Sequence, residues 1–146
     1  MSATADHAEE RTNPATRLGF EPGQVVQEIG YDDDVEQELR EGIETVIGTD
    51  LVDEDYDDVA DVVLLWFRDE DGDLTDALVD AIGLIDEGGA ILLLTPKTGR
   101  DGYIEPSDIN EAAQTAGLTQ TKSVNAGKDW SGSRLVTPKA AKTGKR

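Results

Sequence analysis

A loop in the second half of the chain carries the residues best suited to hold an anion. Lys97, Thr98 and Arg100 flank Gly99, directly after an apolar segment. Two cations, a hydroxyl and a glycine that exposes backbone N–H groups are the groups that bind phosphate or carboxylate. The order is not that of a P-loop, because the string Gly-x4-Gly-Lys-Ser/Thr is absent from the sequence. The loop indicates either a simple anion contact or a pair of cations paired with nearby acids.

Other reactive groups are scarce, which excludes several classes of chemistry. The sequence has no cysteine, and its one histidine, His7, lies in a polar leading segment. Disulfides, zinc–thiolate sites, thiol chemistry and Ser-His-Asp triads are therefore excluded. The acidic stretch from Asp69 departs from a calcium-binding loop, because its sixth position is Leu74 rather than glycine and its twelfth is Asp80 rather than glutamate. We predict no catalytic residue and no metal site.

The spacing of apolar residues predicts strands that alternate with helices. Continuous apolar runs at 62–67 and 91–94 indicate strands buried on both faces, as in a parallel sheet. Asp73 is placed to cap a helix, and Pro106 suits the first turn of another. Leu51-Val52 is either a very short strand or an anchor. The expected strands are 24–29, 61–67, 90–94, 119–124 and 134–136, and the expected helices are about 32–47, 74–85 and 106–116.

These elements specify a fold class. One-helix crossovers between strands predict an α/β, three-layer Rossmann-like open sheet, mostly parallel, of about five or six strands. The last two strands are separated by about ten residues, too few for a crossover, so they must form a C-terminal antiparallel pair. We expect one domain over 17–137, with a disordered lead at 1–16 and a basic, disordered tail at 138–146.

The carboxyl ends of the strands are the expected ligand edge, because open α/β sheets bind ligands there. We expect this edge to be a structural contact, a surface for a protein partner, or a pocket for a small anion or nucleotide with Trp130 as a stacking plane. In the structural alternative, which we favour, Lys97 and Arg100 lie within about 4 Å of the carboxylates of Asp32–Asp34 and Trp130 covers the end of the core. The candidate edge residues are Gly30, Tyr31, Asp32, Arg68, Lys97, Thr98, Gly99, Arg100, Trp130 and Ser131.

Charge is distributed unevenly along the chain, whose net charge is −19. Residues 1–96 hold 27 acidic and 4 basic residues, whereas 97–146 hold 5 acidic and 9 basic residues. An acidic body repels phosphate, which argues against nucleic acid and anionic membranes as partners and leaves a protein partner open. Such an acidic surface is expected both of a protein that is kept soluble by its charge and of a protein adapted to high salt. The sequence contains neither an apolar run of about 18 residues nor a secretory signal, so we expect a cytoplasmic protein.

Several segments together resemble a known family. These are LGFEPGQ at 18–24, DVVLLW at 61–66, TPKTGR at 95–100 and WSGSR at 130–134. The combination resembles the DUF3052 family, best known from actinobacteria, and covers nearly everything between the tails. At the level of fold, the order of elements from 61 to 136 is similar to the second half of a class I methyltransferase. The resemblance implies a fold and a cytoplasmic home, and it brings no established activity or catalytic residue.

The methyltransferase likeness raises the question of S-adenosylmethionine. The first strand ends in Gly30, followed by Tyr31 and the acids Asp32–Asp34, where a cofactor loop needs further glycines. Those acids would face the cofactor's own carboxylate at high cost. Residues 48–60 are too few for the missing strand–helix–strand segment, so we expect no cofactor. We predict a non-catalytic binding or regulatory module; the alternative is a degenerate enzyme or a nucleotide or anion binder at the Lys97/Arg100/Trp130 edge.

Overall fold

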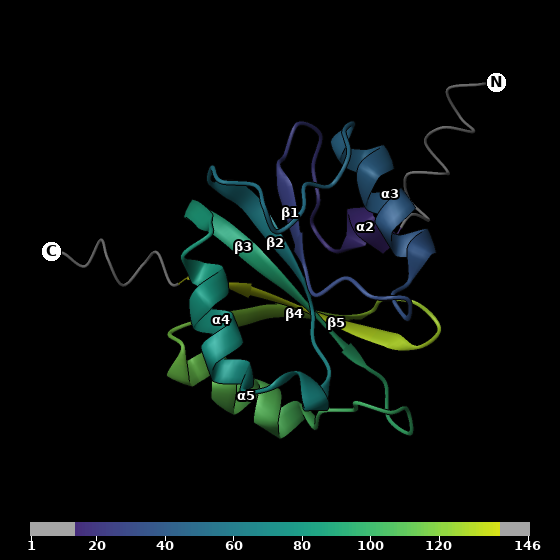
Figure 1. The fold of residues 1–146 in the computed structure, drawn as a ribbon, viewed down its shortest axis with the longest axis vertical. Helices are drawn as coiled ribbons and strands as arrows, with labels where there is room; N and C mark the ends of the chain where they lie inside the picture. Colours follow the sequence, from purple (N-terminus) through teal and green to yellow (C-terminus); the bar gives the residue numbers. More distant parts are fainter. Residues whose placement is uncertain (1–13, 138–146) are drawn as a thin grey trace, which may run out of the picture.

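Residues 14–137 form a five-stranded sheet with helices on both faces in the computed structural model, which describes this part of the chain (Figure 1). The strand order is β1-β2-β3-β5-β4, so β5 lies between β3 and β4. The expected number of strands and the α/β class are confirmed. The strands are β1 (Val26–Ile29), β2 (Ala60–Trp66), β3 (Ile85–Pro96), β4 (Thr119–Asn125) and β5 (Trp130–Val136).

The sheet is mixed, and the prediction of a mostly parallel sheet is wrong. β1 pairs with β2 and β2 with β3 in parallel, but β5 is antiparallel to both β3 and β4. The last two strands do form the expected antiparallel hairpin. The prediction failed because β5 inserts between β3 and β4, so one reversed strand contributes two antiparallel pairings rather than one.

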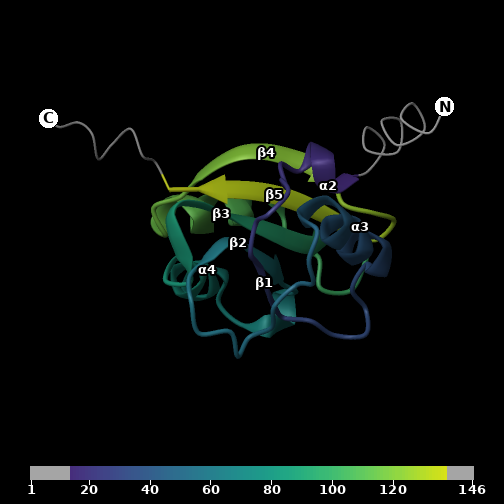
Figure 2. The ribbon, with the colours of Figure 1, turned by 90° about the horizontal axis from the view of Figure 1, so that it is seen from above.

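The helices cover the two faces of the sheet in pairs (Figure 2). Helices α2 (Pro14–Arg17) and α3 (Gln37–Ile47) lie on one face, and α4 (Leu74–Ile82) and α5 (Pro106–Thr115) lie on the other. A short 3-10 turn, η1 (Asp69–Asp71), follows β2. The three-layer arrangement therefore follows the expectation. Within residues 14–137 no helix is long and apolar enough to cross a membrane.

The molecule has two hydrophobic cores, one on each face of the sheet, and side chains that alternate along the central strands β2 and β3 contribute to both. On β2, Leu64 packs in the cluster under α3, whereas its neighbours Val63 and Leu65 pack in the cluster under α4 and α5. Successive strand residues point to opposite faces, so a continuous apolar run serves both layers. Figure 1 shows β2 and β3 in the middle of the sheet, between the two pairs of helices.

Element boundaries differ from the expectations in two places. Helix α4 ends at Ile82, and Ile85 already belongs to β3, where it pairs with Ala60. Gly88-Gly89 does not end the helix but lies in an irregular stretch of β3, where a Cβ on Gly89 would lie 2.8 Å from the Asp61 carbonyl oxygen. The second difference is helix α3, which begins at Gln37 rather than at the acids 32–34.

The folded part also begins earlier than expected. Helix α2 starts at Pro14, and Ala15 is fully buried, so the end of the expected disordered lead belongs to the fold. The rest of that lead, 1–13, and the expected tail, 138–146, lie outside the described residues. Val52 makes an isolated parallel bridge to Gln27, so Leu51-Val52 acts as an anchor beside β1. Residues 48–60 contain no further helix or named strand.

Candidate functional site

The carboxyl end of β1 is closed by a buried arginine. Arg68, which follows β2, is 7% exposed. Its guanidinium bonds both carboxylate oxygens of Asp34, with Nε–Oδ2 at 3.0 Å and Nη2–Oδ1 at 2.5 Å. Nη1 also donates to the Gly30 carbonyl oxygen at 3.0 Å and lies 3.2 Å from Asp71 Oδ2. A bidentate arginine–carboxylate pair with further acceptors fixes the loop after β1 in one position.

This pair shifts the proton affinity of both partners. The hydrogen bond from Arg68 lowers the pKa of Asp34 below its ordinary value, and partial burial opposes the change. The hydrogen bond with Asp34 likewise raises the pKa of Arg68. Both groups are therefore charged at neutral pH. The pair places opposite charges where a ligand of this edge would have to bind.

Trp130 lies beneath the arginine and is buried. Its ring is 5.2 Å from the Arg68 guanidinium and 4.9 Å from the ring of Trp66, edge to face. Its indole N–H donates to the backbone carbonyl of Asp34 at 2.9 Å. With 2% of its surface exposed, Trp130 presents no free face to a ligand. The prediction that Trp130 covers the end of the core fits this geometry, whereas a stacking plane does not.

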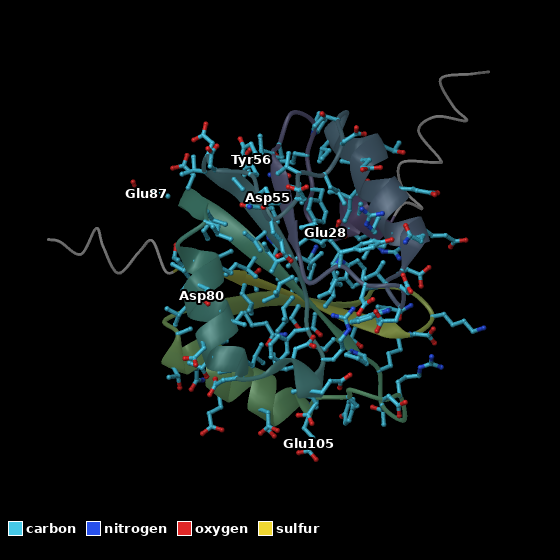
Figure 3. The ribbon with its side chains drawn as sticks, in the orientation of Figure 1. Glu28, Asp55, Tyr56, Asp80, Glu87 and Glu105 are labelled. Atoms are coloured by element: carbon cyan, nitrogen blue, oxygen red, sulfur yellow. The ribbon has the colours of Figure 1, made fainter. Side chains whose placement is uncertain are left out.

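A second ion pair lies beside the first and was missed by the sequence analysis. Glu28, in β1, is 7% exposed and accepts from Arg40 Nε and Nη2 at 2.7 and 2.8 Å. It also accepts from the indole N–H of Trp66 at 2.9 Å. In Figure 3 Glu28 lies between β1 and α3, whereas the labelled Glu105 projects from the outside of the molecule. One signal was available: Val26 points toward α3, so Glu28, two residues on, must point the same way.

Arg40 is held in place by this ion pair, and its side chain contacts Tyr31, the residue after Gly30. The hydrogen bond with Glu28 raises the pKa of Arg40. Its guanidinium lies 4.7 Å from the centre of the Tyr31 ring, and the Tyr31 hydroxyl accepts from Gln37 at 3.1 Å. Tyr31, half exposed, thus packs on α3 instead of facing a pocket. Asp32 is exposed, and its carboxylate accepts from the backbone N–H of Asp33 at 2.7 Å.

Lys97 and Arg100 do not reach the acids after β1, so the predicted pairing is wrong. Arg100 pairs with Asp129 at 3.2 Å, and both side chains are well exposed. Lys97 has no ion pair among the described residues; its backbone N–H donates to the Asp129 carbonyl. The reason is strand order: Arg68 follows β2, the neighbour of β1, whereas the 97–100 loop follows β3, one strand farther away.

The predicted edge therefore divides among three places. Gly30, Arg68 and Trp130 surround Asp34. Gly99 and Arg100 line an open hollow of about 410 Å³ together with Asp34, Asp101, Asp129 and the buried Trp130. Of the other five predicted residues, Lys97, Thr98 and Ser131 line a separate groove of about 430 Å³ between α5 and the sheet, whereas Tyr31 and Asp32 line neither. Among residues 14–137 no three His, Cys, Asp or Glu side chains are placed to hold a metal ion.

The groove has further lining residues that the sequence analysis missed. Thr95, Ser123 and Ser133 belong to it, and all three lie within strands. Serine and threonine in a strand give no signal of their own, because the register between strands decides whether their side chains meet. One sequence signal was available for Thr95, because this polar residue directly follows the apolar run 91–94 of β3.

Solved structures with a similar fold are methyltransferases. They include a methyltransferase from Pyrococcus furiosus (TM-score 0.51, 15% identity, 84% of this chain and 78% of that one) and CcbJ from Streptomyces caelestis (0.54, 12%, 89% and 95%). The magnesium protoporphyrin IX methyltransferase ChlM from Synechocystis, solved with bound SAH, has a TM-score of 0.56 at 12% identity, over 89% and 83% of the chains. At such identities the likeness concerns the fold alone.

The residues after β1 do not fit the cofactor of those enzymes. Gly30 has φ +85°, and a Cβ there would lie 2.3 Å from the Trp66 carbonyl oxygen, so the end of β1 packs directly on the end of β2. Arg68 fills the adjoining space with its pair to Asp34. The loop offers one glycine and three acids in place of a cradle of backbone N–H groups.

Relatives in sequence are mycobacterial proteins described as uncharacterized. One from Mycobacterium tuberculosis and one from Mycobacterium bovis are each 54% identical over 142 residues, which is 97% of this chain and 87% of theirs. The model of one family, described as "Protein of unknown function (DUF3052)", matches residues 15–139. These limits nearly coincide with those of the described fold. The chain belongs to the DUF3052 family.

Proposed function

We propose that this protein is a non-catalytic binding or regulatory module on a methyltransferase-like fold whose cofactor edge is closed by its own side chains. The observation that carries the proposal is the buried Arg68, bonded to Asp34 and to the Gly30 carbonyl. Opening this edge would break several charge-assisted hydrogen bonds of Arg68 and separate its side chain from Trp130, so a ligand would have to offset both losses. A ligand has to bind elsewhere on the molecule.

The alternative function, a degenerate enzyme at the Lys97/Arg100/Trp130 edge, has less support. The three side chains do not converge on one site: Arg100 and Trp130 line one hollow, where Arg100 pairs with Asp129 and Trp130 is buried under Arg68, whereas Lys97 lines a different hollow. A reaction at one substrate needs its groups positioned together within a few ångströms. Of the three, Lys97 is placed to meet a ligand.

The proposed setting is the cytoplasm, with a protein or a small molecule as the partner. The acidic body disfavours nucleic acid and anionic lipid, because both need lysine and arginine contacts to phosphate. Exposed carboxylates crowd the region before β2, the outer sides of the helices and the start of β3, and Asp55, Asp80 and Glu87 respectively illustrate this in Figure 3.

Calorimetry with S-adenosylmethionine and SAH tests the proposal. We expect no saturable heat with either compound, and no change in tryptophan fluorescence, because Trp66 and Trp130 both lie at the closed edge. Fluorescence must respond to any opening of this edge, and unfolding the protein in urea provides the positive control for that response. Stoichiometric binding of either compound at micromolar concentration, with a change in tryptophan emission, would overturn the proposal.

A further inference from the structure

On the side of the sheet that faces α5, the apolar surface gives way to hydroxyl groups. Along β3, Leu93 is followed on this face by Thr95. Opposite them on β5 lie Ser133, which pairs with Leu93, and Ser131, which pairs with Thr95. Ser123 of β4 lies opposite Ser133. Three neighbouring strands thus place four hydroxyls on one patch of the sheet.

Two of these hydroxyls are buried and lack a partner. Thr95 is 3% exposed and Ser133 is 7% exposed, yet neither side chain has a hydrogen bond among the described residues. Buried polar groups normally have partners, and Glu28 and Arg68 in this molecule do. In the described part of the chain, the one fully enclosed side-chain N or O atom without a hydrogen-bond partner is Gln27 Oε1. The hydroxyls of Thr95 and Ser133 are therefore not fully enclosed, and they are open to the groove that they line.

The groove over this patch is large enough for a small organic molecule. Its volume is about 430 Å³, within the range of about 300–1,000 Å³ that is usual for ligand sites. The hydroxyls form its floor, and Tyr103, Ile104, Pro106 and Ile109 form the opposite wall. A polar floor and a partly apolar wall suit a ligand with a charged or hydroxylated end and a carbon body.

The charges around the groove favour an anion. Among its described lining residues Lys97 is the charged one, and no carboxylate lines it, although acids outnumber bases 32 to 13 in the chain. Lys97 forms no ion pair with a described residue, so an anion would not have to displace a carboxylate from it. Helix α5 begins at Pro106, so the positive end of its dipole lies at the wall. The acids of that turn, Glu105 and Asp108, are exposed and do not line the groove, and Glu105 projects outward in Figure 3.

From these observations we infer that the groove binds the oxyanion group, a carboxylate or a phosphate, of a small organic molecule. Lys97 supplies the charge, and the hydroxyls of Thr95, Ser131 and Ser133 donate hydrogen bonds to the anionic oxygens. The inference rests on the proposed binding function and names the site and the ligand class that it would use. It differs from the edge expected from sequence, because neither Arg100 nor Trp130 takes part.

Amide NMR titrations of the full chain test the site. The probes are inorganic phosphate, acetate, a hexose phosphate and the uncharged hexose, each compared with sodium chloride at equal ionic strength. We expect saturable amide shifts at 95, 97–98, 120–123 and 131–133 with at least one phosphate or carboxylate probe, and none with the uncharged hexose. The phosphate and acetate arms distinguish the two sources of the oxyanion.

Matched variants separate a site from a general charge effect. Lys97→Met keeps the apolar stem and is expected to weaken binding about tenfold or more, whereas Lys128→Ala, the same charge change outside the groove, leaves affinity unchanged. Ser133→Ala and Thr95→Val are expected to weaken binding severalfold. Because the Thr95 hydroxyl makes no hydrogen bond within the described part of the chain and valine has nearly the same shape, Thr95→Val is not expected to lower the melting temperature of the free protein, so loss of binding cannot be ascribed to unfolding.

The outcomes are decisive in both directions. Equal affinity for Lys97→Met and Lys128→Ala, shifts that map outside the groove, or no shift with any anionic probe would overturn the inference. A titration with S-adenosylmethionine on the same spectra reports on the proposed function independently, because its expected position is Gly30 and the 31–34 loop. The proposed function and the anion site are therefore tested by shifts at different residues, and the failure of one does not decide the other.

Discussion

Arg68 is the residue on which the closed edge depends, and its chemistry explains why an arginine occupies the position. The side chain satisfies Asp34, the Gly30 carbonyl and Asp71 at once, while its flat face lies over Trp130. A lysine has one compact charge and cannot bond two carboxylate oxygens in a fork while stacking on an indole. The requirement is geometric as well as electrostatic, so a basic residue alone does not replace it.

The pH dependence of stability should carry the signature of Asp34. Because its pKa is lowered in the folded protein, the unfolded chain binds its proton more tightly. The ion pair therefore stabilises the protein above the unfolded pKa of about 3.9, and the stabilisation is lost as the pH falls through the lower folded pKa. We expect Asp34→Asn to cost about 1 kcal/mol near pH 7, a modest value because the carboxylate is 55% exposed.

A neighbouring acid supplies the control for that measurement. Asp33→Asn makes the same change of charge at an exposed side chain that has no contact with Arg68. In urea denaturation the difference between Asp34→Asn and wild type should be constant from about pH 6 to 8 and should shrink as the pH falls below the unfolded pKa of about 3.9. A difference that persists undiminished at low pH, or an equal effect of Asp33→Asn, would contradict the role given to Asp34.

At the scale of elements, the turn after β1 depends on one glycine. Gly30 combines φ +85° with a carbonyl oxygen 2.3 Å from where its Cβ would lie, whereas Gly48, at the end of α3, has the same φ and open space. Gly48→Ala therefore measures backbone strain alone, about 1 kcal/mol. Gly30→Ala adds a clash with the backbone of β2 and should cost about 2–4 kcal/mol. Urea denaturation of both variants provides the comparison, and equal losses would show that β1 and β2 are not packed as described.

Elements were largely predictable from the sequence, whereas contacts between elements were not. The apolar runs at 62–67 and 91–94 identified the central strands, and the short link after β4 identified the closing hairpin. The strand order lies beyond such patterns, because it depends on where β5 inserts. That order decides that Arg68 rather than Lys97 meets Asp34.

The candidate groove was predictable only in part, for the same reason. Lys97, Thr98 and Ser131 were identified because they follow strands or begin one. The buried hydroxyls of Thr95 and Ser133 were not, because they come together only once β3 and β5 pair in their observed register. Single polar residues within apolar strands are common, and periodicity cannot show which of them face a cavity.

For the whole molecule, the uneven charge has a consequence for stability. The net charge of −19 is concentrated before residue 97, in the segment that provides β1, α3, β2 and α4. Within residues 14–137 four ion pairs between side chains are present, so most carboxylates are not neutralised locally. Mutual repulsion of these carboxylates opposes the compact state. The two partly buried pairs, Glu28–Arg40 and Arg68–Asp34, hold the acidic half together against it.

Salt should therefore stabilise this protein. Between about 0.01 M and 1 M salt the Debye length falls from about 30 Å to about 3 Å, which screens the exposed carboxylates but affects the partly buried pairs much less. We expect the melting temperature at pH 7 to rise over this range and then to level off, with a smaller rise at about pH 4, where many carboxylates are protonated. Calorimetric scans in sodium chloride measure both. A melting temperature that falls or stays constant with salt would contradict dominant self-repulsion. Screening is complete at about 1 M salt, so a melting temperature that continues to rise well above this concentration would favour halophilic adaptation over a surface that serves solubility alone.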